Sequence, residues 1–152
     1  KEIARHCRSN VELAFLSGLL HSIGRPAVIQ AIIDLARNHE IELNEEEVLA
    51  LEHNYAQKIS NSVVTTWKMP TLVIESVSYF DDYANAPTAV NQAALLNAGA
   101  QYASHMLEPE ALEKDALLAL PVMAALNLYQ DEAEELLTHS EAVQGRLEGM
   151  SS

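Results

Sequence analysis

Apolar residues recur along this chain at intervals of three and four, the spacing that one side of an α-helix requires. The pattern predicts helices over residues 2–8, 10–22, 26–38, 44–67, 70–80 and 88–107. Two short helices separated by Pro121 follow over residues 115–128, and an acidic amphipathic helix covers 131–149. No stretch shows the strict alternation that a half-buried strand would need. We therefore predict an all-α fold, a compact bundle of several helices.

The helix over residues 10–22 is apolar on nearly every side, which is typical of a helix in the middle of a fold. It ends at His21 and Ser22, and Gly24 follows as a small residue that can adopt a positive, left-handed φ and is therefore suited to a helix terminus. Pro26 can open the next helix, whose first turn does not use its missing N–H. This pattern predicts a buried helix that presents His21 at a tight corner. We expect one shared core around it, made of Phe15, Leu19, Ile23, Ile59, Val63 and Trp67.

Local signals mark other helix boundaries. Asn10 and Asn44 are N-cap residues by type, and three glutamates follow Asn44 in the first turn, where the helix dipole favours negative charge. Pro70 is expected to begin a shorter helix, and residues 81–87 read as a loop. In the helix over 26–38, the inward residues are predicted to be Val28, Ile29, Ile32, Ile33 and Leu35.

The C-terminal helix has few apolar anchors compared with its acidic residues. Its sparse apolar side consists of Leu136, Leu137, Val143 and Leu147. A helix with so little apolar surface depends on tertiary or partner contacts for its stability. We therefore expect it to behave as an added contact helix rather than as part of the core.

Composition and charge restrict the classes of function. The chain has 22 acidic and 9 basic residues and a formal net charge of −13, which disfavours binding to nucleic acid or to an anionic membrane surface. Cys7 is the one cysteine, so no internal disulfide forms, as is usual in a reducing cytoplasm. We see no apolar run near the roughly 20 residues of a membrane span. A chain that starts at Lys1 is expected to be a piece of a longer protein.

Two segments carry a resemblance to a known family. Gly18-Leu19-Leu20-His21-Ser22-Ile23-Gly24-Arg25 resembles the Gly-Leu-Leu-His-Asp-Ile-Gly-Lys signature of the HD superfamily, in its HDOD branch. Ile59-Ser60, Val63-Val64 and Trp67-Lys68-Met69-Pro70, followed by Ile74 and Val77, are similar to a second segment of that branch. The resemblance implies an HDOD-like helical core over residues 1–107, without the helical front half of the family domain, and a C-terminal helical extension over 108–152.

The resemblance also implies where the chemistry of the superfamily would lie. Catalytic HD phosphohydrolases bring histidines and aspartates together on metal ions, which generate hydroxide from bound water. His21 retains its family residue, but Ser22 stands where a metal-bridging aspartate is expected. The remaining positions of the family site correspond to Ala56, Phe80 with Asp81, and Ala100. One histidine cannot hold a catalytic metal, which takes about three protein ligands. We therefore expect no metal and no cofactor.

Two functional classes remain open. The first is a non-catalytic, HDOD-like regulatory module of bacterial signal transduction, which acts in the cytoplasm through other signalling domains or proteins, with a homo-oligomer also open. The second is a metal-dependent phosphohydrolase that cleaves a phosphate ester or cyclic dinucleotide with His21, His53, Asp81 and Asp82 as unusual ligands. In either class, His21, Arg25 and His53 are the candidate ligand contacts. A plain helical bundle with chance similarity is disfavoured, because two separate segments match in the right order.

Overall fold

The computed structural model describes residues 1–39 and 42–150, with side chains described through His139 and at Ala142. Its elements are α1 (Glu2–His6), α2 (Val11–His21), α3 (Gly24–His39), α4 (Glu45–Thr66), α5 (Thr71–Ser78), the 3₁₀ helix η1 (Tyr83–Asn85), α6 (Val90–Leu107), α7 (Lys114–Leu118), α8 (Pro121–Ala125) and α9 (Gln130–Met150). The described residues contain no strand, and the predicted all-α fold is confirmed.

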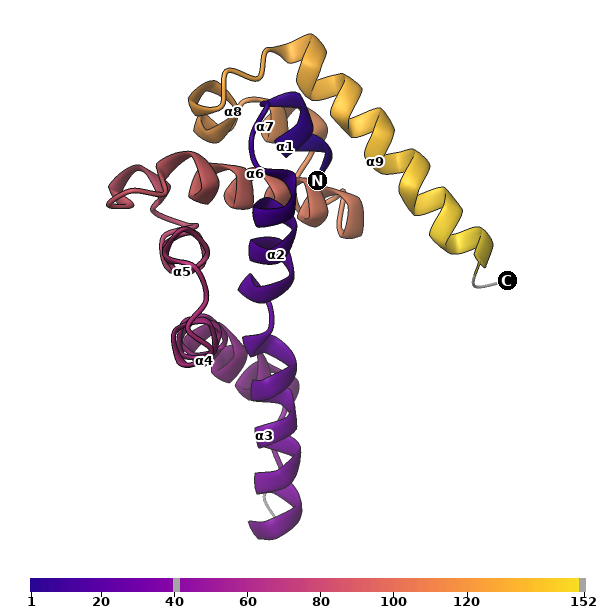
Figure 1. Cartoon of the computed structure of the whole chain (residues 1–152). Coiled ribbons are helices and arrows are strands. Elements are labelled where there is room, and N and C mark those ends of the chain that lie inside the picture. The colour runs from indigo at the N-terminus through magenta and orange to yellow at the C-terminus, as the bar shows by residue number, and fades with distance from the viewer. Residues whose placement is uncertain (40–41, 151–152) are drawn as a thin grey trace.

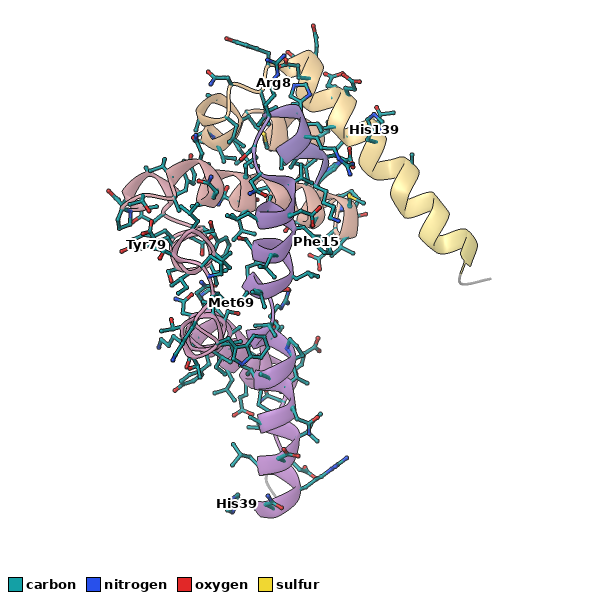
Figure 2. All side chains as sticks on the ribbon, viewed as in Figure 1. Arg8, Phe15, His39, Met69, Tyr79 and His139 are labelled. Atoms are coloured by element: carbon teal, nitrogen blue, oxygen red, sulfur yellow. The ribbon has the colours of Figure 1, made fainter. Side chains whose placement is uncertain are left out.

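The helices are arranged around α2, which runs through the centre of the molecule (Figure 1). α3 continues almost in line with α2 after a short turn and packs along α4. α5 packs against α2, α4 and α6, and α6 crosses α2. α1, α7 and α8 lie above α6, from where α9 descends along one side (Figure 1). Figure 2 shows His39 at the tip of α3, far from α6 and α9.

The predicted capping residues begin the helices as expected. At α4, the Asn44 side chain accepts a 2.9 Å hydrogen bond from the Glu47 amide, and the Glu47 carboxylate accepts one of 2.9 Å from the Asn44 amide. This reciprocal capping box satisfies two amides that a helix start otherwise leaves unpaired. Asn10 caps α2 by accepting from the Leu13 amide at 2.9 Å, and Pro70 directly precedes α5.

Two clusters of buried side chains hold the helices together, and α6 contributes to both. The first joins α2, α4, α5 and α6 through Leu20, Val64, Val73, Val77 and Leu96. The second joins α6 to the C-terminal helices through Ala94, Ala98, Tyr102, Leu117, Val122, Met123, Leu128, Leu136 and Leu137.

Three of the predicted core residues are exposed, and that part of the prediction is wrong. Phe15 is 41% exposed, Leu19 is 56% exposed and Trp67 is 59% exposed. The apolar residues of α2 go all round the helix, but its neighbours cover only the side of Ser17 and Leu20. Trp67 lies just beyond the last residue of α4, where the chain turns away through Lys68 with a φ of 53°.

The other predicted core residues are covered to different degrees. Ile23, Ile59 and Val63 are half-buried, and Ile23 packs against the first cluster. In α3, Val28 and Ile32 are buried as predicted, whereas Ile33 and Leu35 are exposed. The physical reason is that α3 extends away from the body of the molecule and packs mainly on α4, so only one side of it is covered.

The first half of α9 belongs to the core, which corrects the prediction of an added contact helix. Ala133, Leu136 and Leu137 are buried, and the Tyr102 hydroxyl donates a 2.9 Å hydrogen bond to the Ala133 carbonyl. Burial raises the pKa of Tyr102 to about 12. Beyond these turns α9 runs clear of the other helices (Figure 1). The predicted apolar residues Val143 and Leu147 lie outside the described side chains.

One stretch, Val11–His39, is long and apolar enough by length and composition alone to cross a membrane, contrary to the sequence-based expectation. Length and apolar composition do not by themselves identify a membrane-spanning helix, because core helices of soluble proteins and signal sequences share both properties. Here the stretch is divided between α2 and α3 by a turn at Ser22 and Ile23.

Candidate functional site

The corner between α2 and α3 is held by one serine of α4. Ser60 is fully buried, and its hydroxyl donates a 2.7 Å hydrogen bond to the His21 carbonyl. The same oxygen accepts a 2.9 Å hydrogen bond from the Gly24 amide. The carbonyl at the end of α2 and the amide at the start of α3 are groups that helix ends leave unpaired. Ser60 satisfies both groups and thereby fixes the angle between α2 and α3 at the corner that carries His21.

Gly24 is needed at this corner for close approach, not for an unusual backbone angle. A Cβ at this position would lie 1.8 Å from the Ala56 carbonyl oxygen and 2.9 Å from Ser60 Oγ. None of the described glycines has a positive φ, so the predicted role of Gly24 as a left-handed helix terminus is wrong. Gly24 is instead the first residue of α3, and the absence of its side chain lets α3 contact the backbone of α4.

Beside the corner lies a groove of about 990 Å³, bounded by α1, α2, the first half of α4, and α6. Every residue that the sequence assigned to the family site lines this groove: His21, Ser22, Ala56, Phe80, Asp81 and Ala100. Arg25 and His53, the other predicted ligand contacts, line it as well. The fold therefore brings these dispersed positions together at one place.

His21 makes its contacts at the wall of the groove. Its Nδ1 lies 2.7 Å from the Gly18 carbonyl oxygen, one turn earlier in α2. A carbonyl oxygen only accepts, so Nδ1 of His21 carries the hydrogen in this contact. The ring also meets Phe80 edge-on, with centroids 5.7 Å apart and an interplanar angle of 68°. A phenylalanine thus packs on the histidine where a metal ligand would be needed.

The charged groups of the groove include one that the sequence analysis missed. The Arg25 guanidinium pairs with the carboxylate of Glu52, and both residues line the groove. Glu52 lies four residues before Ala56, so helical spacing from that family position could have found it. Gln57 also lines the groove, and its amide donates to the Val77 carbonyl. His53 is exposed.

The two loop aspartates lie in different surroundings. Asp81 lines the groove, and partial burial raises the pKa of its carboxyl, while the nearby His21 acts in the opposite direction. Asp82 is not among the residues that line the groove. Its carboxylate accepts hydrogen bonds of 2.8 and 3.0 Å from the Asn85 side-chain amide in η1. The structure therefore brings three of the four alternative ligands to the groove and uses the fourth to order a turn.

The residues present do not fit the metal ions of the HD superfamily. Among the side chains that the structure describes, those of residues 1–39, 42–139 and 142, no three of His, Cys, Asp or Glu are grouped so that they could hold a metal. Around His21 the family positions that line the groove offer one carboxylate, at Asp81, besides a serine hydroxyl, two alanines and a phenyl ring. A divalent ion with about three protein ligands has no such set of donors here.

The walls of the groove are apolar and open. Phe15, Leu19, Leu49 and Leu107 line it and are all exposed. Gly18 and Gly99 also line it, and a Cβ at either position would meet no other described part of the chain within 4 Å. The groove thus combines large exposed apolar side chains with two places where the helix surface is bare backbone.

The fold and the histidine corner define a helical domain of HD type. The HDOD domain family model matches residues 1–83, which is more than half of the chain, so the chain belongs to the HDOD domain family. This match is shorter than the predicted resemblance over 1–107. No curated protein and no solved structure matches the chain.

Proposed function

We propose that this HDOD domain is a non-catalytic regulatory module of bacterial signal transduction, which works by contacts with other domains or proteins. The family suggests an HD-superfamily signalling module. The observation that carries the non-catalytic proposal is the set of residues in the groove. Ser22, Ala56, Phe80 and Ala100 line it at the positions where the superfamily places its metal ligands.

The exposed apolar walls support a role in contacts. Phe15, Leu19, Leu49 and Leu107 are large apolar side chains, and all four border one groove. Exposed apolar surface that gathers at one place is typical of interaction sites, whereas single exposed apolar residues are ordinary. The formal net charge of −13 and the single cysteine favour a cytoplasmic protein partner over nucleic acid.

The first experiment separates the regulatory module from the alternative phosphohydrolase. The purified protein is dialysed against Mn²⁺, Fe²⁺, Zn²⁺ or Ni²⁺, its metal content is measured, and its hydrolysis of a phosphomonoester and a cyclic dinucleotide is assayed. We expect no stoichiometric metal and no hydrolysis. A bound metal together with hydrolysis that His21→Ala abolishes would establish the phosphohydrolase instead. Hydrolysis that His21→Ala leaves unchanged would come from a contaminating enzyme.

The second experiment tests contacts through the groove directly. A photo-crosslinking amino acid is introduced at position 107 or at position 129 of the full-length protein, which is expressed in its source organism. Leu107 borders the groove, whereas Tyr129 does not. The two side chains are similarly exposed, at 80% and 74%, so they form a matched pair. We expect a discrete adduct from position 107 only, with a signalling protein or a neighbouring domain identified by mass spectrometry. Equal labelling from both positions would contradict the proposed role of the groove.

A further inference from the structure

Titratable side chains gather between α1 and α9, on a side of α1 that does not border the groove. A small pocket of about 290 Å³ lies there, and none of its lining residues lines the groove. We define the α1–α9 cluster as the ionisable side chains of this pocket together with Glu132, which contacts one of them. Its members are Glu2, Arg5, His6, Glu132, Glu135 and His139. Figure 2 shows His139 on α9, at the level of α1. The cluster contains two of the six histidines of the chain.

A charge contact in this cluster joins the two helices. Nε2 of His6, in α1, lies 3.2 Å from Oε1 of Glu132, in α9. The other carboxylate oxygen of Glu132 accepts a 3.0 Å hydrogen bond from the Tyr129 amide, just before α9 begins. The Tyr129 amide and, after it, His6 hold the pKa of the Glu132 carboxyl below its usual range. Glu132 therefore stays ionised in mild acid, and the charge of the pair changes only with the imidazole.

The charge balance of the whole cluster also depends on its two histidines. Histidine side chains change charge between about pH 5 and pH 8. When His6 and His139 are neutral, three carboxylates share the cluster with one guanidinium, which is already paired with Glu2 inside α1. When both are protonated, three positive charges meet three carboxylates. α2 and α6 also pack on α1, but among the described residues neither contributes a side chain to the pocket. Mild acid therefore adds attraction between α1 and α9.

The remaining contacts of α1 with the C-terminal helices do not titrate in this range. Ile3 and Cys7 pack against the second cluster, and the Cys7 thiol lies 3.9 Å from the Leu126 carbonyl oxygen. Burial, and after it the charge of Glu132, raises the pKa of the Cys7 thiol. Burial also raises the pKa of Tyr102, in the second cluster, to about 12. Both groups stay neutral up to pH 8, so this packing is a constant background to the charged contacts.

We propose that the α1–α9 cluster is a pH-sensitive clasp, which protonation of His6 and His139 tightens. α1 leads directly into α2, whereas α9 lies outside the residues that the HDOD family model matches. The clasp makes the attachment of the C-terminal helices to the HDOD part of the chain depend on pH. The side chains of His6 and Glu132 are 32% and 39% exposed, so water screens the pair and the response is graded. The clasp does not depend on a partner in the groove.

A double-mutant cycle isolates the contact between His6 and Glu132. His6→Gln, Glu132→Gln and the double variant are compared with the unmodified protein by urea unfolding. The measurements are made at about pH 5.5 and about pH 8, below and above the ordinary histidine pKa of about 6.5. The control cycle uses Lys114 and Glu134, which pair at 3.4 Å between α7 and α9 and are 48% and 41% exposed. A lysine keeps its charge at both pH values.

We expect the coupling of His6 with Glu132 to favour folding about threefold at the lower pH and less than about 1.5-fold at the higher pH, as for a half-exposed ion pair. The coupling of Lys114 with Glu134 should be the same at both. His139→Gln should lower stability more at the lower pH than at the higher pH. None of the substituted side chains is buried, so the variants should fold.

Two results would overturn the clasp. One is a coupling of His6 with Glu132 that is no larger at the lower pH than at the higher pH. The other is a coupling of the control pair that changes with pH to the same extent. Either result would leave the contacts proposed for the groove untouched, because none of the residues of the α1–α9 cluster lines the groove.

Discussion

At the corner, Gly24 lies against the backbone of α4, whereas in the groove Gly18 and Gly99 lie against open space. The three residues are chemically identical, and all three are in helices with ordinary φ values. Only the surroundings differ. The corner is closed by contacts within the chain, and the groove is left open by the same helices that form the corner.

This comparison divides the segment Gly18–Arg25, which carries His21, into two parts with different surroundings. The Gly24 end of the motif fixes how α2, α3 and α4 meet, and Ser60 completes it. The His21 side borders a surface with few metal-binding groups and much apolar area. On the non-catalytic function that we propose, the chain keeps the first part for its fold, and the second part borders a surface for contacts.

Gly24→Ala should give the largest loss of stability. Its Cβ would lie 1.8 Å from a backbone oxygen, so α3 and α4 would have to separate. Forced overpacking of this kind costs typically about 1–3 kcal/mol, and we expect about 3 kcal/mol because the obstacle is backbone. Urea unfolding measures it, with Gly99→Ala as the same chemical change in open space. Equal effects of the two variants would remove the distinction between corner and groove.

Ser60→Ala should cost about 2 kcal/mol. It leaves the Gly24 amide and the His21 carbonyl without their partner in a buried place, and each unpaired buried group costs about 1–3 kcal/mol. Ser62→Ala, at an exposed serine of the same helix, is the control and should stay within about 0.5 kcal/mol of the unmodified protein. A loss no larger than that of the control would show that the corner does not depend on this hydroxyl.

Gly18→Ala and Gly99→Ala should each stabilise the isolated chain by about 0.5–1 kcal/mol. Alanine is the better helix former, and nothing in the described structure stands in the way of its methyl group. Urea unfolding of each variant and of the unmodified protein measures the change. Destabilisation by either variant would mean that the groove is already filled from within the chain.

Trp67→Ala should have the smallest effect, below about 0.5 kcal/mol, because most of the side chain is already in water. Val77→Ala, at a fully buried position of the first cluster, is the comparison and should cost about 2 kcal/mol. Thermal or urea unfolding measures both. A loss of several kcal/mol at Trp67 would return it to the core in which the sequence pattern placed it.

The sequence was sufficient for the helices, for the two predicted caps and for a set of dispersed positions that line one groove. Helical spacing and capping residues act locally, so α4 begins with the capping box expected at Asn44. The two family segments located residues far apart in the chain, and the fold gathers them on one groove. The ion pair between Arg25 and Glu52 was missed, because it joins two helices whose relative rotation only the fold determines.

Burial was predicted less well, since periodicity shows which residues share a helix side but not which side is covered. Phe15 and Leu19 lie on a side of α2 that no described helix covers, although α2 is apolar all round. The opposite error occurred at α9, where Leu136 and Leu137 are enough to place the first turns in the core despite the surrounding acidic residues. Two leucines that pack into the second cluster bury this part of α9, although the helix as a whole has few apolar residues.

The hydrogen bond from the Gly24 amide to Ser60 also determines how fast this amide exchanges its hydrogen with solvent. An amide in a turn ordinarily exchanges its hydrogen with solvent through small local openings. The Gly24 amide is held by a buried side chain of a different helix, so it is released only when α3 and α4 part. In deuterated water, the slowest hydrogen of the corner should therefore be found at the junction of two helices, and its rate should report the separation of those helices.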